Sequence, residues 1–202
     1  MTLNKLNAYT IIRPFHVIKN GEVLVDEQSA GLQEFLRSLY DRFAGQYQKF
    51  HKMDLLSKLG WMAAEVLLQD MPMDKYPQED TALVFANRSA SLDTDERYYD
   101  TVQDIASPAL FVYTLPNIVT GEISIRHKFK GENAFFVSEQ FDIPFMTAYV
   151  QQLLDTNAAQ ACICGWIEQY HEDFEAVLFL VEKEGRGAAL PFTAGQIEKL
   201  YQ

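Results

Sequence analysis

The stretch of this sequence that most resembles a reactive site is GENAFFVSEQFDIPF, residues 131–145, a pattern that predicts a strand, a sharp turn and a helix. Enzymes often place a nucleophile at such an elbow, because the start of the following helix lowers the pKa of a thiol. The residue at this turn is Gln140. A glutamine amide is neither nucleophilic nor titratable near pH 7, so we expect no covalent catalysis here. The alternative interpretation is a helix-start residue that hydrogen-bonds nearby backbone.

The two thiols of the chain also give little reason to expect chemistry. Cys162 and Cys164 alternate along a predicted strand and therefore share one face of it. A disulfide between them would be strained, and no further ligands stand at the spacing that a metal needs. We expect inert core thiols in a reducing, cytoplasmic compartment, with neither a metal nor a cofactor.

Two charged clusters remain as candidate binding sites. The basic one consists of Arg126, His127, Lys128 and Lys130. Acidic proteins dock on basic patches, so this cluster is a candidate docking surface, although a solvated helix end explains it equally well. His171 lies in QYHEDFE, where a divalent metal is conceivable but an exposed acidic loop is the favoured interpretation.

Composition excludes several classes of function. The chain has 202 residues and a formal net charge of -11, which argues against non-specific binding to nucleic acid and against anionic membrane surfaces. We find no signal-peptide pattern and no apolar run of the length that spans a bilayer. Repeats and linkers are also lacking, so we predict one domain over residues 1–202.

The predicted elements alternate between strands and helices. We expect strands at 9–18, 81–87, 133–138, 160–169 and 176–184, and helices within 30–50, 53–70, 91–107, 142–157 and 193–202. Pro14 suggests that the first strand lies near an edge, and Asn20-Gly21 predicts a hairpin turn. Residues 111–129 are ambiguous between strand and helix. This order predicts an α/β fold, a mixed, mostly parallel sheet with helices on both faces.

Several short motifs in the second half of the chain occur in a familiar order and spacing. Asn117 follows a proline in SPALFVYTLPN. Gly131 and Asn133 belong to GEN, in which Gly131 stands nine residues before Gln140. About two dozen residues later, CICGWIE contains Gly165 and Glu168. Together these motifs resemble the N-terminal half of a β-ketoacyl synthase (3-oxoacyl-ACP synthase) of the thiolase-like superfamily. The similarity extends over about residues 50–185.

The resemblance implies both a fold and a loss of activity. In such synthases a nucleophilic Cys stands where this chain has Gln140, and two catalytic His residues belong to a C-terminal half that this sequence does not contain. Glutamine at this position resembles chain-length-factor subunits, and also decarboxylating synthase domains. We therefore expect a non-catalytic subunit or scaffold of fatty-acid, aryl-polyene or polyketide biosynthesis. The resemblance assigns structural roles to Asn117, Gly131, Asn133 and Gly165, and a buried hydrogen-bonding role to Glu168.

Two other functions remain open at this point. One is a residual acyl-thioester enzyme, a malonyl decarboxylase or acyl transferase. The other is an acyl-chain binding module, which would be disfavoured if Phe135, Phe141 and Phe145 filled the acyl tunnel.

The resemblance also implies partners. The strand at 133–138 corresponds to the two-fold interface of the family, and the bulky Phe145, Met146 and Tyr149 on the next helix suit a further interface. We expect a homodimer, or a heterodimer with an active ketosynthase. Acyl carrier protein is the expected acidic partner of residues 126–130, and no nucleic-acid or membrane partner is expected.

Overall fold

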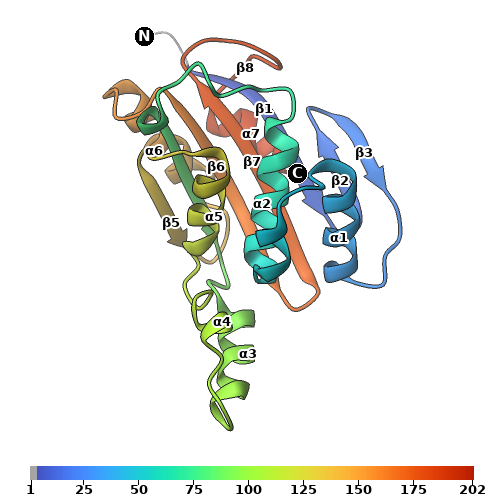
Figure 1. Ribbon diagram of the computed structural model, residues 1–202. Helices are drawn as coiled ribbons and strands as arrows, with labels where there is room; N and C mark the ends of the chain where they lie inside the picture. Colours follow the sequence, from blue (N-terminus) through green and yellow to red (C-terminus); the bar gives the residue numbers. More distant parts are fainter. Residues whose placement is uncertain (1–3) are drawn as a thin grey trace.

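The computed structural model describes residues 4–202, in which strands and helices alternate after an N-terminal pair of hairpins (Figure 1). The strands are β1 Lys5–Arg13, β2 His16–Lys19, β3 Glu22–Asp26, β4 Thr81–Asn87, β5 Asn133–Val137, β6 Ala161–Tyr170, β7 Asp173–Glu182 and β8 Leu190–Pro191. The helices are α1 Leu32–Phe43, α2 Leu55–Leu68, α3 Leu92–Val102, α4 Pro108–Phe111, α5 Ile118–His127, α6 Ile143–Asp155 and α7 Ala194–Tyr201, with 3-10 turns η1 Gln48–Lys52 and η2 Gln78–Asp80.

The described strands form one mixed sheet in the order β3-β2-β1-β7-β6-β4-β5, and β8 pairs with β1. The α/β class and the mixed sheet are thus confirmed. Parallel pairing is confined to β5, β4 and β6, a smaller share than the alternation of elements led us to expect. The reason is that hairpins join β1 to β2, β2 to β3, and β6 to β7, and hairpins are antiparallel.

Residues 9–18 are not one strand near an edge, as predicted, but parts of β1 and β2. Pro14 ends β1, and Phe15 takes a positive φ of 65° in the turn between the two strands. Proline interrupts strand pairing because it has no N–H to donate. The hairpin at Asn20-Gly21 is confirmed, and the ambiguous segment 111–129 contains the helix α5.

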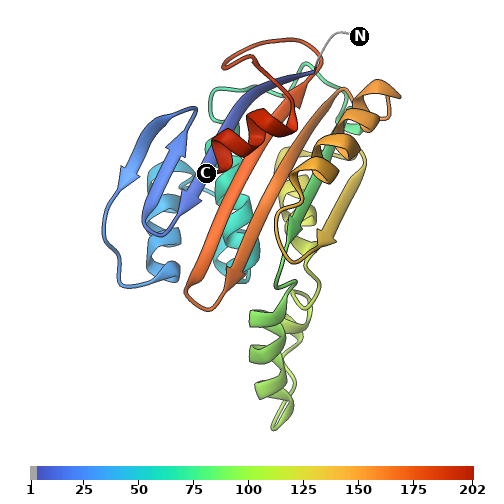
Figure 2. The ribbon, with the colours of Figure 1, turned by 180° about the vertical axis from the view of Figure 1, so that it is seen from behind.

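Helices cover both faces of the sheet and divide the core into two parts. Helices α1, α2 and α5 lie on one face, and Figure 2 shows α6 and α7 on the opposite face. Strand β4 is buried along all seven residues because helices cover both of its faces and strands pair with both of its edges. No helix within residues 4–202 has the length and apolar character required to cross a bilayer.

Helices α3 and α4 form an arm, residues 92–115, that projects beyond the end of the sheet where β4 and β5 finish (Figures 1 and 2). Seven large hydrophobic side chains of this arm are exposed: Leu92, Tyr99, Val102, Ile105, Phe111, Val112 and Leu115. Except for Tyr113, which is buried in the core, the arm therefore leaves much of its apolar surface exposed within the described part of the chain. An exposed apolar surface of this kind indicates an interaction site.

Candidate functional site

The predicted elbow is present between β5 and α6. Ser138 fixes the turn, since its N–H donates to Asn87 O at 2.9 Å and its hydroxyl donates to Gln140 O at 2.8 Å. Asp142 caps α6 by accepting a hydrogen bond from Phe145 N at 2.9 Å. Because Asp142 performs the capping, the side chain of Gln140 is left exposed in the turn, two residues before the cap.

Beside Gln140 lies a pocket of about 500 Å³ that we call the elbow pocket. Its lining residues are Arg88, Glu139, Gln140, Phe141, Trp166, Glu168, Asp173, Glu175 and Tyr201. The ring of Phe141 is buried between Trp166 and Tyr201, with ring centroids 5.7 and 5.3 Å away. This packing closes the apolar side of the elbow and leaves a pocket in which four carboxylates dominate.

Glu168 is the most enclosed of these carboxylates, with 5 % of its surface exposed. Its Oε2 accepts hydrogen bonds from Arg88 N at 2.6 Å and Ser89 N at 3.2 Å. Its Oε1 is buried and has no hydrogen-bond partner among residues 4–202. A buried carboxylate oxygen without a donor is costly, so this atom marks a place where a donor is expected.

Glu175 and Tyr201 also line the pocket, and a guanidinium group outside its lining is paired with Glu175. Arg13 Nε lies 2.7 Å from Glu175 Oε1, and Tyr201 donates its hydroxyl to Glu175 Oε2 at 2.9 Å. Burial, together with the charge of Glu175, raises the pKa of Tyr201. The phenol therefore remains a neutral donor at any physiological pH.

The glycines named from the resemblance stand where a side chain does not fit. A Cβ at Gly165 would lie 1.9 Å from Val177 O, and the residue has φ +153°. A Cβ at Gly131 would lie 2.4 Å from Thr81 O. Asn117 precedes α5 without a side-chain cap, and Asn133 is an exposed residue at the start of β5. The two glycines thus allow close backbone packing beside β4 and β7.

The basic cluster at 126–130 is partly neutralised by a residue far away in the sequence. Arg126 donates two hydrogen bonds to Glu65, at 3.0 and 3.1 Å, and His127 Nε2 lies 2.9 Å from Glu65 Oε1. Burial alone would raise the pKa of Glu65, but the hydrogen bonds from His127 and Arg126 and their charges lower it. Lys130 Nζ lies 4.0 Å from Glu79 Oε1, and Lys128 is exposed and forms no ion pair with residues 4–202.

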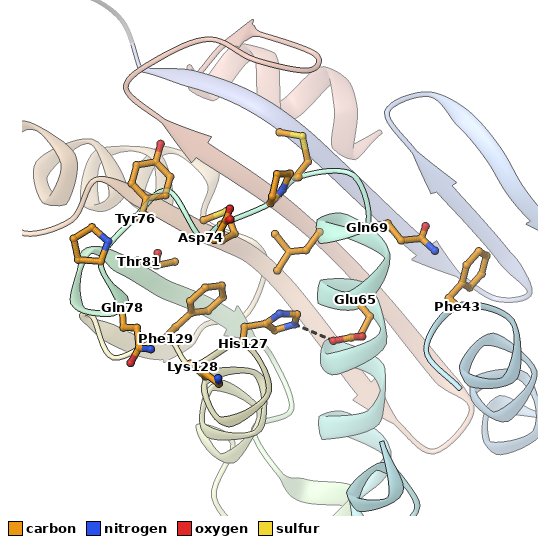
Figure 3. Close-up of a pocket in the computed structure, with 15 residues that line it drawn as sticks. Phe43, Glu65, Gln69, Asp74, Tyr76, Gln78, Thr81, His127, Lys128 and Phe129 are labelled. Atoms are coloured by element: carbon orange, nitrogen blue, oxygen red, sulfur yellow. Dashed lines mark ion pairs between the residues drawn. The ribbon is translucent and has the colours of Figure 1, made fainter. Parts of the chain in front are cut away.

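Figure 3 shows His127 and Glu65 in the wall of a second pocket, of about 540 Å³, between the C-terminal ends of α2 and α5. Phe129 stacks on His127 with centroids 5.4 Å apart, and Phe43 and Tyr76 line the same space. This pocket borders Thr81 at the start of β4, whereas the elbow pocket lies where β5 ends. The two pockets are thus at opposite ends of the parallel strands.

A second basic cluster, which the sequence did not reveal, surrounds the start of α2. His51, Lys52 and Lys58 line a pocket of about 280 Å³ together with Arg97 of the arm. Burial lowers the pKa of Lys58 despite the nearby Asp54. Lysine and histidine in QKFHK were visible signals, but Lys58 and Arg97 join them only through the fold.

As expected, the two cysteines lie in the core and His171 lies in an exposed turn, and none of the three is arranged for catalysis. Cys162 and Cys164 are completely buried, and burial raises the pKa of the Cys162 thiol. His171 Nδ1 lies 3.5 Å from Asp93 Oδ1, and its Nε2 lies 3.6 Å from Glu96 Oε2. Within residues 4–202, no three His, Cys, Asp or Glu side chains are grouped as metal ligands.

Comparison with solved structures identifies the architecture. The structure of the ishigamide ketosynthase/chain length factor is similar to this chain with a TM-score of 0.66 and 16 % sequence identity. The alignment covers 89 % of this chain and 62 % of the ishigamide chain. A ketosynthase (ApeO) in complex with its chain length factor (ApeC) from Xenorhabdus doucetiae matches 92 % and 81 %, with a TM-score of 0.58 and 14 % identity. A β-ketoacyl synthase from Burkholderia phymatum STM815 matches 91 % and 60 %, with a TM-score of 0.66 and 10 % identity.

The chain has the thiolase-like fold. It spans about 60 % of the length of the ishigamide and Burkholderia proteins. No protein-family model matches the sequence, and no curated protein does. The likeness at 10–16 % identity therefore concerns the fold, and the function must be argued from this chain's own residues.

Proposed function

We propose that this chain is a non-catalytic ketosynthase-like subunit, similar in role to a chain length factor, which pairs with an active ketosynthase of fatty-acid, aryl-polyene or polyketide biosynthesis. The observation that carries this proposal is Gln140, an exposed amide in the turn of the thiolase-like elbow. It provides neither a thiol nor an alkoxide for an acyl-enzyme. Structures of ketosynthases with chain length factors share the fold, which supports such a pairing.

The edge of the sheet at β5 is the first part of the proposed interface. In the part of the chain that the structure describes, strand β5 pairs with β4 on one side only, and Val137 at its end is 56 % exposed. On the adjacent helix α6, Phe145 is 43 % exposed and packs edge-to-face on Phe136. An unpaired edge beside exposed aromatic rings favours addition of a strand from another chain.

The arm is the second part, and its charge favours a partner other than a second copy. Besides the seven exposed apolar side chains, the arm carries five acidic residues against the single basic Arg97. Two copies of an acidic arm would repel each other at a common interface. A ketosynthase with a basic and apolar facing surface would complement it.

For the carrier protein, we propose a different docking surface from the one predicted at 126–130. Arg126 and His127 are already paired with Glu65. His51, Lys52 and Lys58 stand together at the start of α2, beside the buried Asp54 that caps the helix. This second basic cluster is therefore our proposed docking surface for the acidic carrier.

Two observations count against the alternative functions. Phe141 is buried between two aromatic rings, so the apolar space that an acyl chain would need beside the elbow is filled. The open space has four carboxylates, which disfavour the malonyl carboxylate on which a decarboxylase would act. An acyl-binding module and a residual acyl-thioester enzyme are both less consistent with this site.

The proposal is tested by purifying the tagged chain from its host. We expect an active β-ketoacyl synthase to co-purify in near-stoichiometric amount. We also expect malonyl-loaded carrier protein to keep its malonyl group when it is incubated with the chain alone. If no synthase is recovered the subunit role is wrong, and if carbon dioxide is released by the chain alone the non-catalytic assignment is wrong.

A further inference from the structure

We infer that the elbow pocket binds an organic cation, a guanidinium or primary ammonium group, which Glu168 and the ring of Trp166 hold. This inference depends on the pocket itself and stands whether or not the chain pairs with a ketosynthase. It assigns to the elbow a ligand of the opposite charge to a malonyl or phosphate group.

The balance of charge in the pocket is the first argument. Of its four carboxylates, Glu175 is paired with Arg13 and Asp173 with Arg88, at 2.7 and 3.5 Å. Glu139 and Glu168 have no basic side chain of residues 4–202 within ion-pair distance. Glu139 and the enclosed Glu168 are therefore the two lining carboxylates without a basic partner, beside a space of about 500 Å³, which is enough for a small ligand group.

The orphaned oxygen of Glu168 is the second and independent argument. Its Oε2 is held by two backbone N–H groups, so the carboxylate is fixed and cannot turn to find a donor. Its Oε1 is then buried without a donor from the described residues. A charged donor that reaches Oε1 would form a charge-assisted hydrogen bond, which is about twice as strong as a neutral one.

The aromatic rings indicate the kind of donor. Trp166 and Phe141, both largely buried, are among the lining residues, and aromatic rings attract guanidinium and ammonium groups. The opposite wall already shows this pairing within the chain, because the guanidinium of Arg13 contacts Glu175 and lies 5.8 Å from the ring centroid of Tyr201. On the Glu168 side, a carboxylate and the ring of Trp166 also line the pocket, and the guanidinium of Arg88 there is paired with Asp173 and forms no ion pair with Glu168.

A metal ion fits this site less well than an organic cation. Within residues 4–202 no three candidate ligands are grouped around a common point. Hard cations require several oxygen ligands at close range, whereas a guanidinium group needs one carboxylate and a ring face.

The test is a titration of the intact chain with N-acetyl-arginine amide, followed by the tryptophan indole N–H signals in ¹H–¹⁵N spectra. The chain has two tryptophans, Trp61 in the core and Trp166 in the pocket, and a Trp166→Phe variant assigns the signals. We expect a saturable shift of the Trp166 signal, with a Kd of about 1 mM, and an unmoved Trp61 signal. N-acetyl-citrulline amide, which has nearly the same shape and no charge, should give no saturable shift.

Matched variants locate the site. Glu168→Gln should weaken binding of the arginine amide about tenfold, because a charge-assisted bond is lost. Glu198→Gln removes the same charge from an exposed position on α7 and should change binding less than about twofold. If the spectrum shows that Glu168→Gln does not fold, the exposed Glu139→Gln replaces it, with an expected weakening of about threefold.

Two further probes distinguish the source of the cation. A blocked pentapeptide with a central arginine that binds at least about tenfold tighter than agmatine supports a side chain from a partner protein. Equal binding of agmatine supports a free amine. Equal shifts with the citrulline and arginine amides, or no saturable shift up to about 10 mM, would overturn the proposal and leave only water at Glu168.

Discussion

Strands β5 and β6 both lie parallel to β4, one on each side of it, yet they meet different surroundings. Strand β6 also pairs with β7 along ten residues and is buried at nine of its ten positions. Among residues 4–202, strand β5 has no second neighbouring strand, and its positions are only partly buried or exposed. The comparison shows that the β6 side is where the fold is stabilised, whereas the β5 side, with the elbow and the arm next to it, is where another molecule can be contacted.

The largest expected effect comes from a side chain added to β6. In Gly165→Ala the new Cβ would lie 1.9 Å from Val177 O, at a φ of +153° that other residues avoid. We expect a loss of more than about 4 kcal/mol in the free energy of unfolding, measured by urea denaturation, or no folded protein at all. Gly121→Ala is the control, since nothing lies near its Cβ and a helix favours alanine by about 1 kcal/mol. A stable Gly165→Ala protein would contradict this account of β6.

A smaller effect follows from removing one of two paired phenylalanines. Phe85 of β4 and Phe135 of β5 are partners in the parallel register. Phe85 is completely buried, so Phe85→Ala should cost about 3–5 kcal/mol, whereas Phe135 is half-buried and Phe135→Ala should cost about 1–2 kcal/mol. Urea midpoints of the two variants test the difference. Equal costs would mean that β5 belongs to the core as fully as β4 does.

The ion pairs of Glu65 should give an intermediate, pH-dependent effect. Because Arg126 and His127 lower the folded-state pKa of Glu65, its stabilising contribution is present above the ordinary carboxyl pKa and is lost as the pH falls through the lower folded value. We expect Glu65→Gln to cost about 1–3 kcal/mol at pH 7 and progressively less below about pH 4.

Glu79→Gln serves as the control for Glu65, because Glu79 is exposed and its ion pair with Lys130 is long, at 4.0 Å, and lies in solvent. Its cost should remain below about 0.5 kcal/mol at every pH. A cost for Glu65→Gln that does not change with pH would show that the lost ion pairs are not its cause.

The smallest effect on folding, and the clearest effect on a complex, is expected at the sheet edges. Val137→Lys places a charge on β5, and Val23→Lys places the same charge on β3 at the other edge, where Val23 is 57 % exposed. Both should change the free energy of unfolding by less than about 0.5 kcal/mol. Only Val137→Lys should weaken binding to the ketosynthase, by at least about tenfold, in a titration calorimetry experiment. Equal binding by both variants would move the interface away from β5.

The sequence predicted those elements whose pattern is local. Apolar spacing located α2, a short apolar run located β4, and the elbow followed from a strand signal before Pro144 at the start of α6. The pairing of strands across the sheet was harder to predict from the sequence. Hairpins made more of the strand pairs antiparallel than expected, and Pro14 divided the first predicted strand into β1 and β2. Such outcomes depend on neighbours that are distant in the sequence.

The candidate site was predictable only in part for the same reason. Gln140 could be located at the turn from the sequence, but the closing of the elbow by Phe141 depends on Tyr201, sixty residues later. Likewise, the pairing of Arg126 with Glu65 spans 61 positions. Periodicity carries no information about such contacts, because they depend on how α2, α5 and α7 are placed on the sheet.

Native mass spectrometry of the chain, alone and mixed with an active ketosynthase and malonyl-loaded carrier protein from the same host, tests the central claim most directly. We expect a complex of one copy of this chain with one ketosynthase, formed in preference to a homodimer, and an unchanged malonyl mass when the chain is alone with the carrier. A stable homodimer that ignores the ketosynthase, or a malonyl group lost to the chain alone, would contradict the account.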